Sequence, residues 1–168
     1  MSLTVLLAEP DADLARQQAD ALEEIGDLAL SVLRFPQADV VEELERRKPD
    51  ILVLRHERTG PMGFALLARL RKVPALKNLP VLLTTSDATR DAIDRHRASP
   101  TRADFYLPLP ASRAELEEAV RMLAERARAN RALSEASGGG PVEPPRLRRS
   151  NTPAPTPWVQ ADLSEVTL

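Results

Sequence analysis

Residues 48–55 read Lys-Pro-Asp-Ile-Leu-Val-Leu-Arg, and this stretch decides the fold. Residues 51–54 form a continuous apolar run of strand length, without the alternation of a half-exposed strand. A strand that is apolar on both faces is typical of a parallel sheet covered by helices on both sides. The stretch therefore predicts a central buried strand that ends at Arg55.

Apolar runs of the same kind recur along the chain, and amphipathic stretches separate them. The runs predict further strands at residues 3–8, 28–34, 81–84 and 105–107. The amphipathic stretches predict helices that begin after Asp11 or Asp13, at Pro36, after residue 61, at Asp87 and at Ser112. We expect an α/β fold, because strands that alternate with helices form a parallel sheet through right-handed crossovers. The carboxyl ends of the strands are where such sheets place functional side chains.

Local signals mark the ends of two of these helices. Gly26 is expected to end the first helix. Ser112 and Glu115 have the spacing of a capping box, which opens the last helix.

The 168 residues fit one domain followed by a tail. Gly and Pro are dense after residue 137, and such a segment buries too little apolar surface to offset its ordering entropy. We expect a domain at residues 1–137, with a core at 3–126 and a last helix that continues to about 136, and a disordered tail at 138–168. Beyond Leu123 this helix has no apolar stripe, which predicts a solvated continuation, with a docking helix for a partner as the alternative.

Composition excludes several kinds of chemistry. The chain has no Cys, which excludes disulfides, thiolate metal sites and a cysteine nucleophile. Its 23 Lys and Arg against 25 Asp and Glu lack the basic excess of a general nucleic-acid binder. No apolar run is long enough to cross a bilayer, and the start of the chain lacks the pattern of a signal peptide. We expect a cytoplasmic protein with no membrane insertion and no nucleic-acid partner.

Five stretches, taken in order, resemble the receiver domain of bacterial response regulators. They are VLLAEPDADL (5–14), KPDILVL (48–54), GPMG (60–63), LPVLLTT (79–85) and DFYLPLP (104–110). The resemblance covers residues 3 to about 126. It implies a flavodoxin-like, doubly wound sheet of five parallel strands in the order 2-1-3-4-5, with five helices.

The resemblance also implies where phosphorylation chemistry would lie. Receivers accept a phosphoryl group on an Asp at the end of the third strand, where this chain has Arg55. An acidic pair after the first strand helps to hold a divalent cation, and the pair here is Glu9 and Pro10. The Lys that reaches the phosphoryl oxygens is replaced by Leu109. The acceptor, one acid and the lysine are absent together.

Two other family positions are kept. Thr85 is the hydroxyl residue after the fourth strand, and Tyr106 is the aromatic switch residue. Without a phosphoryl group, Thr85 is expected to satisfy a backbone group. The resemblance also implies a cis bond between Leu109 and Pro110.

Arg55 changes what this pocket can do. A guanidinium stays protonated, so it cannot accept a phosphoryl group, and it repels a cation that needs hard oxygen ligands. We therefore expect no phosphotransfer, no metal, no cofactor and no enzymatic activity. The first and third strands are neighbours in the implied fold, so Arg55 is predicted to pair with Glu9. The alternative is that Arg55 points into solvent.

Neither histidine is predicted to have a catalytic or metal-binding role. His56 has no second His or Cys near it in sequence, which predicts an exposed loop residue. His96 is expected to be a solvated residue near a helix end.

The function that these features favour is a phosphorylation-independent pseudo-receiver, which acts as a protein-interaction or adaptor module in bacterial signalling. The alternative is a conventional or atypical phosphorelay receiver that still accepts a phosphoryl group. The resemblance implies partner docking or homodimerisation through the fourth helix, fifth strand and fifth helix, where we selected Ile93, Tyr106 and Val120. In the tail, Trp158 and Leu163 are candidates for a motif that folds on a partner.

Overall fold

The computed structural model describes residues 2–33, 39–58 and 62–136. Residues 1–133 form one compact unit, and only residues 134–136 of a second unit at 134–168 are described. Several predictions concern positions outside the described residues: the helix start at Pro36, the loop at 59–61, the tail at 138–168, and the motif residues Trp158 and Leu163.

The sheet has five parallel strands in the order β2-β1-β3-β4-β5, which confirms the predicted fold class and strand order. The strands are β1 (Leu3–Ala8), β2 (Leu28–Leu33), β3 (Ile51–Arg55), β4 (Val81–Thr85) and β5 (Phe105–Pro108). The central strand β3 is apolar on both faces, as its sequence predicts.

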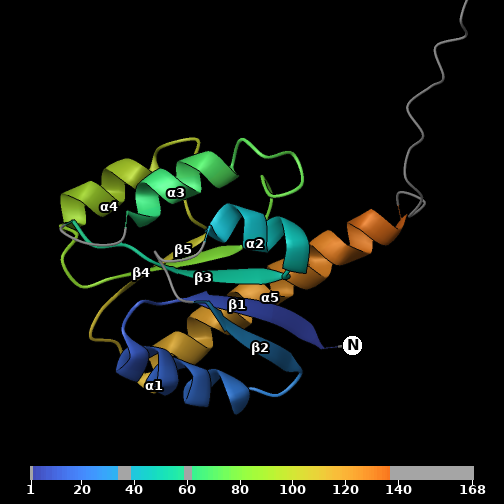
Figure 1. The fold of residues 1–168 in the computed structure, drawn as a ribbon, viewed down its shortest axis with the longest axis horizontal. Coiled ribbons are helices and arrows are strands. Elements are labelled where there is room, and N and C mark those ends of the chain that lie inside the picture. Colours follow the sequence, from blue (N-terminus) through green and yellow to red (C-terminus); the bar gives the residue numbers. More distant parts are fainter. Residues whose placement is uncertain (1, 34–38, 59–61, 137–168) are drawn as a thin grey trace, which may run out of the picture. The chain divides into compact units, whose positions relative to one another are not determined.

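Helices cover both faces of the sheet. They are α1 (Ala12–Glu23), α2 (Val40–Arg47), α3 (Gly63–Leu70), α4 (Arg90–Arg97) and α5 (Arg113–Ala136). Figure 1 shows α1 and α5 on one face and α2, α3 and α4 on the other. The two core clusters follow this division, because alternate residues of β3 enter opposite faces: Leu52 and Leu54 join the α2–α4 side, and Ile51 and Val53 join the α1–α5 side.

Side-chain caps fix where most of the helices begin. Asp11 caps α1, and the reciprocal bonds between Ser112 and Glu115 confirm the capping box of α5. The predicted start of α4 at Asp87 was too early, since α4 begins after Thr89, and α2 begins after Asp39. In both cases the residue before the helix is extended and its side chain accepts from the first-turn amides, so the chain turns helical only beyond it. Gly26, at φ +70°, lies just past the end of α1.

The predicted solvated continuation of α5 is wrong for its first turns. Ala124 and Ala127 are buried in the core cluster of the α1–α5 side. Further along, Arg131 donates to the carboxylate of Asp50 at 2.7 Å. The buried face of this part of α5 is made of alanines. The sequence therefore shows no stripe of large apolar residues that would have predicted its burial.

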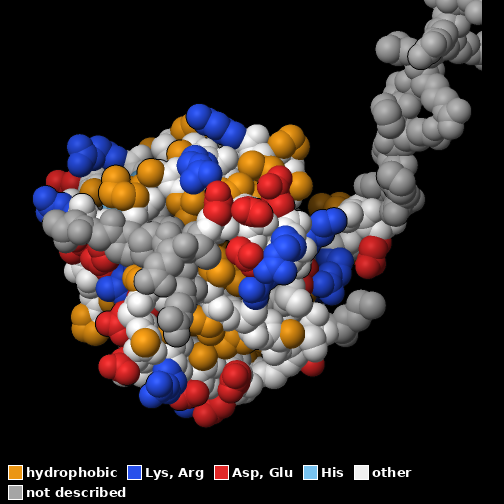
Figure 2. Space-filling model, in the orientation of Figure 1, with side chains coloured by type: hydrophobic (Ala, Val, Ile, Leu, Met, Phe, Trp, Pro, Cys, Tyr) orange, Lys and Arg blue, Asp and Glu red, His pale blue; other side chains and the backbone are white. Residues whose placement is uncertain are grey.

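Surface charge is mixed, and no helix within the described ranges is long and apolar enough to span a membrane. Figure 2 shows acidic, basic and hydrophobic side chains interspersed on the face that it presents. This pattern agrees with the near balance of charges in the whole chain.

Candidate functional site

The candidate site lies at the carboxyl edge of the sheet, where β1, β3 and β4 end. Ala8 of β1 pairs with Leu54 of β3, so the residues that follow them, Glu9 and Arg55, leave the sheet side by side. Arg55 in turn pairs with Thr84 of β4. The parallel register therefore brings together side chains that are 29 to 46 residues apart.

The predicted pair between Arg55 and Glu9 is confirmed. Arg55 Nη1 donates to Glu9 Oε2 at 3.0 Å, and the Glu9 side chain is 1% exposed. The backbone N–H of Asp11 donates to the other carboxylate oxygen, Oε1, at 3.0 Å. Burial raises the pKa of Glu9 above its ordinary value, while the Asp11 amide and the Arg55 guanidinium oppose that shift. The Glu9 carboxylate is thus enclosed between a backbone donor and a guanidinium.

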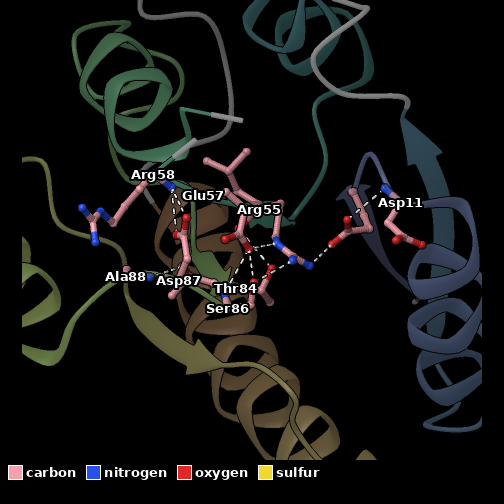
Figure 3. Close-up of polar contacts among 11 residues, drawn as sticks. Asp11, Arg55, Glu57, Arg58, Thr84, Ser86, Asp87 and Ala88 are labelled. Carbon is pink, nitrogen blue, oxygen red and sulfur yellow. Dashed lines mark hydrogen bonds and ion pairs between the residues drawn. The ribbon is translucent and has the colours of Figure 1, made fainter. Parts of the chain in front are cut away.

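Arg55 has two further partners that the sequence reasoning missed. Its Nε donates to Glu57 Oε1 at 2.5 Å, and its Nη2 donates to Ser86 Oγ at 3.3 Å. Ser86 also donates to Glu57 Oε1 from its backbone N–H and its hydroxyl, at 3.0 and 2.8 Å. In Figure 3 the Arg55 guanidinium lies between two groups: Glu57 and Ser86 are on one side, and the end of β1 is on the other. Glu57 could have been predicted as a partner, because it is an acidic residue only two positions after Arg55. Ser86 could not, because it reaches Arg55 from the neighbouring strand.

The adjoining loops are tied together by a second acidic group. Both carboxylate oxygens of Asp87 accept the backbone N–H of Arg58, at 2.8 Å (Figure 3). The β3–α3 and β4–α4 loops are therefore joined through Glu57, Ser86 and Asp87. Among the described residues, no three His, Asp or Glu side chains are grouped so that they could hold a metal ion.

The remaining predicted pocket residues lie around this network. Thr85 Oγ1 accepts the backbone N–H of Ala88 at 3.1 Å, which confirms its predicted backbone-satisfying role. The Leu109–Pro110 bond is cis, as the resemblance implied. Pro10 is exposed. Arg55 and Leu109 also line a groove of ≈ 570 Å³ between α1 and the start of α5.

His56 is not the exposed loop residue that was predicted. It is 6% exposed, its ring stacks on Phe64 at 3.7 Å between centroids, and its Nδ1 accepts the Phe64 backbone N–H at 3.2 Å. The close packing depends on Gly63, since a Cβ there would lie 2.8 Å from the His56 Cβ and 2.6 Å from the Arg55 carbonyl oxygen. The missing side chain at residue 63 lets the start of α3 cover the histidine.

His96 is also not solvated as predicted. Its ring stacks on the other side of Phe64, at 4.1 Å between centroids, and its Nδ1 lies 2.6 Å from Tyr106 Oη. Tyr106 Oη also accepts the Ala103 backbone N–H at 3.0 Å, so the hydroxyl joins His96 to the loop before β5. Burial lowers the pKa of both His96 and His56 and raises the pKa of Tyr106.

The residues selected for partner docking need correction. Ile93, Tyr106 and Val120 are buried in the domain core, so their side chains are not on the surface. An apolar side chain on the same face that is exposed is Met122, at 52%. Met122 lies one turn before Arg126, whose bond to Asp104 at the start of β5 shows that this side of α5 faces the β5 edge.

The fold is that of the receiver domains of two-component response regulators, and the chain is similar in sequence to proteins of that family. No family model matches the chain. It is 37% identical over 116 residues to the adventurous-gliding motility protein Z of Myxococcus xanthus, covering 69% of this chain and 8% of that protein. It is 34% identical over 107 residues to the phosphate regulon transcriptional regulatory protein PhoB of Rhizobium meliloti, covering 64% of this chain and 45% of that protein. The chain thus spans less than half the length of these relatives.

Solved structures give the same result. The signal receiver domain of a DNA-binding response regulator from Colwellia psychrerythraea matches with a TM-score of 0.65 and 26% identity, over 74% of this chain and 99% of that chain. The signal receiver domain of a histidine kinase from Syntrophus aciditrophicus shares the fold, with a TM-score of 0.62 and 24% identity, over 73% of this chain and 89% of that chain.

Proposed function

We propose that this chain is a phosphorylation-independent pseudo-receiver, a cytoplasmic signalling module that binds a protein partner and is not an enzyme. The observation that carries the proposal is the Arg55–Glu9 ion pair. A receiver needs a carboxylate acceptor at the end of β3 and a cation beside it. Here a guanidinium occupies that region, and its bonds engage both Glu9 and Glu57.

The chemical argument concerns charge and nucleophilicity. Arg55 cannot attack a phosphorus centre, because its nitrogen lone pairs are delocalised and it stays protonated. Its positive charge neutralises the carboxylates that would attract Mg²⁺, and a Mg²⁺ ion needs several oxygen ligands in octahedral geometry. The pair therefore supplies permanently the cross-strand bridge that a cation would otherwise supply.

Incubation of the full chain with acetyl phosphate and Mg²⁺, followed by intact-mass measurement, tests the loss of phosphotransfer. We expect no added phosphoryl group on the wild-type protein. A conventional receiver run in parallel verifies the phosphodonor. A stable adduct that maps to the folded domain would refute the proposal and support the phosphorelay alternative.

The partner-binding part of the proposal rests on the α4–β5–α5 face. On this face α5 exposes Met122, and α4 exposes the charged pair of Arg97 and Asp94, a mixture of apolar and charged groups that suits a protein surface better than a bilayer. This face is a candidate for homodimerisation or for docking another protein.

Light scattering after size exclusion, combined with affinity capture from the native cell, tests this face. The Met122→Lys variant is expected to lose the dimer or the captured partner. The Ala65→Lys variant, which changes an exposed residue of α3, is the control and is expected to keep it. Equal retention by both variants would remove the α4–β5–α5 face from the proposal.

A further inference from the structure

A second, strongly basic pocket lies at the opposite edge of the sheet from Arg55. The loops before β4 and β5 form it together with α5, and because the strands are parallel these loops lie at their amino ends. Its volume is ≈ 260 Å³. The lining residues that carry the argument are Arg71, Lys77, Arg102, Asp104, Arg126 and Asn130.

The walls of this pocket are held together by Arg71, which is the first residue past α3. Its guanidinium donates to the carbonyl oxygens of Lys77, Leu79 and Arg102, at 3.0, 2.7 and 3.2 Å. It also donates to Asp104 Oδ2 at 3.1 Å. From α5, Asn130 Nδ2 donates to the carbonyl oxygen of Asn78 at 3.2 Å. The two loops are therefore fixed against each other before any ligand arrives, which reduces the entropy cost of binding.

The charge of the pocket is strongly unbalanced. Four lining residues are cationic, Arg71, Lys77, Arg102 and Arg126, and Asp104 is the one lining carboxylate, so the net charge is four minus one, or +3. Asp104 is already engaged by Arg71, by Arg126 at 2.9 Å and by the backbone N–H of Val81. In the ranges that the structure covers, the side chains of Lys77 and Arg102 have no ion pair with a carboxylate. Several like charges that line one pocket favour the binding of an anion.

We propose that this pocket binds a diphosphate group, either as the free anion or as part of a nucleotide. Guanidinium groups match phosphate oxygens in bidentate geometry, and lysine adds a mobile point charge at the mouth. The pocket volume lies below the range of about 300–1,000 Å³ that is typical of pockets for drug-sized ligands. The pocket is therefore expected to enclose the anionic group of a ligand and not a large apolar body. A net charge of +3 favours a diphosphate over a single phosphate. Arg71 forms the floor, and Lys77, Arg102 and Arg126 bind the oxygens.

Isothermal titration of the full chain with pyrophosphate, with ADP and with adenosine tests the proposal. Pyrophosphate and ADP are expected to bind saturably at a single site, and adenosine is expected not to bind. If ADP binds more tightly than pyrophosphate, the nucleoside part also contacts the protein; if both bind equally, the free anion is sufficient. The Lys77→Ala/Arg102→Ala variant is expected to weaken pyrophosphate binding by about 10-fold or more, which corresponds to at least one lost charge-assisted contact.

The matched control is Arg16→Ala/Arg90→Ala, which removes two exposed arginines from α1 and α4 and changes the net charge equally. It is expected to bind pyrophosphate like the wild type. All four replaced side chains are exposed, and unchanged thermal unfolding verifies that each variant is folded. Absence of saturable pyrophosphate and ADP binding would overturn the proposal, as would equal weakening in the control variant. Tighter binding of a single-stranded oligonucleotide than of ADP would assign the pocket to a nucleic-acid backbone instead.

Discussion

The Arg55 guanidinium and the Glu9 carboxylate are 3.0 Å apart at the carboxyl edge of the sheet, although 46 residues separate them in the chain. Both side chains are largely shielded, with 12% and 1% of their surfaces exposed. A shielded ion pair adds little to folding stability relative to two apolar residues in the same place. Removal of one partner is costly, however, because it leaves the other charge buried and unpaired. Substitutions at Arg55 therefore report directly on the site.

Arg55→Met is expected to lower the free energy of unfolding by about 2–4 kcal/mol, because it strands the Glu9 carboxylate in the protein. Urea denaturation with the linear extrapolation measures the change. Arg46→Met is the control, since its partner Glu43 is at the surface and the loss of that pair should change stability little. A change at Arg55 no larger than at Arg46 would contradict a stabilising role for the pair.

The effect of Arg55→Met is expected to diminish in acid. Burial raises the pKa of Glu9, so the folded state favours its neutral form relative to the unfolded chain. A carboxyl group whose pKa is raised in the folded state stabilises the fold at low pH, where it is neutral. That contribution is lost as the pH rises through the pKa of the folded state. Once protonated, Glu9 no longer needs a cation. Urea midpoints measured as the pH falls through the titration of Glu9 should converge for the two proteins, and a constant difference would argue against Glu9 as the stranded group.

The two buried histidines predict a loss of stability in mild acid. Burial lowers the pKa of His56 and of His96 below the ordinary value of 6.5, so the folded state binds fewer protons than the unfolded chain. The contribution of the two neutral histidines to folding stability is therefore fully present above pH 6.5. It is lost as the pH drops from 6.5 toward the pKa values of the folded state. The carboxyls of Glu43 and Glu115 have lowered pKa values, so their contributions are lost only below 4.5.

Thermal unfolding between about pH 7.5 and about pH 5 measures this dependence. His96→Phe keeps an aromatic ring next to Phe64 and removes one titrating group, so its melting temperature should fall less steeply with pH. The readout is the slope, because the variant also loses the hydrogen bond between His96 and the Tyr106 hydroxyl. An unchanged slope would show that His96 does not titrate in this window.

Tyr106→Phe is expected to destabilise the domain by about 1–3 kcal/mol, the usual consequence of leaving a buried donor unpaired. The hydroxyl accepts the N–H of Ala103, whose residue is buried, and bonds to His96. Native-state hydrogen exchange checks the location of the effect: the Ala103 amide should lose protection first. Exchange that is unchanged at Ala103 would contradict this account of the Tyr106 hydroxyl.

Gly63→Ala is expected to cost about 1–3 kcal/mol or more, because the new Cβ overlaps the Arg55 carbonyl oxygen and the His56 Cβ. Gly26→Ala is the informative comparison. Gly26 has φ +70° with nothing within 4 Å of the added Cβ, so its cost is limited to the left-handed backbone, about 1 kcal/mol. Chemical denaturation of both variants should rank Gly63 as the more sensitive position, and the reverse order would show that α3 can shift away from the strand edge.

Local patterns in the sequence were enough to predict the elements and their order, since apolar runs, amphipathic spacing and caps are signals that act over a few residues. The strand pattern also located Arg55 at the end of the third strand, where the structure has it. The Arg55–Glu9 pair was predictable for the same reason, as neighbouring parallel strands end at one edge. The early predicted start at Asp87 shows the limit of composition, because the capping side chain of Thr89 decides where α4 begins.

The identity of the side chains that surround these groups depends on how distant segments pack against one another. Ser86 joins Arg55 through a neighbouring strand, His56 and His96 enclose Phe64 across separate loops, and Ala124 and Ala127 are buried although no large apolar stripe marks them. The basic pocket around Arg71 likewise gathers residues from two loops and α5, which a near-neutral charge total conceals. Burial and pairing depend on contacts between segments distant in the chain, and no local pattern encodes which distant surface will cover a given side chain.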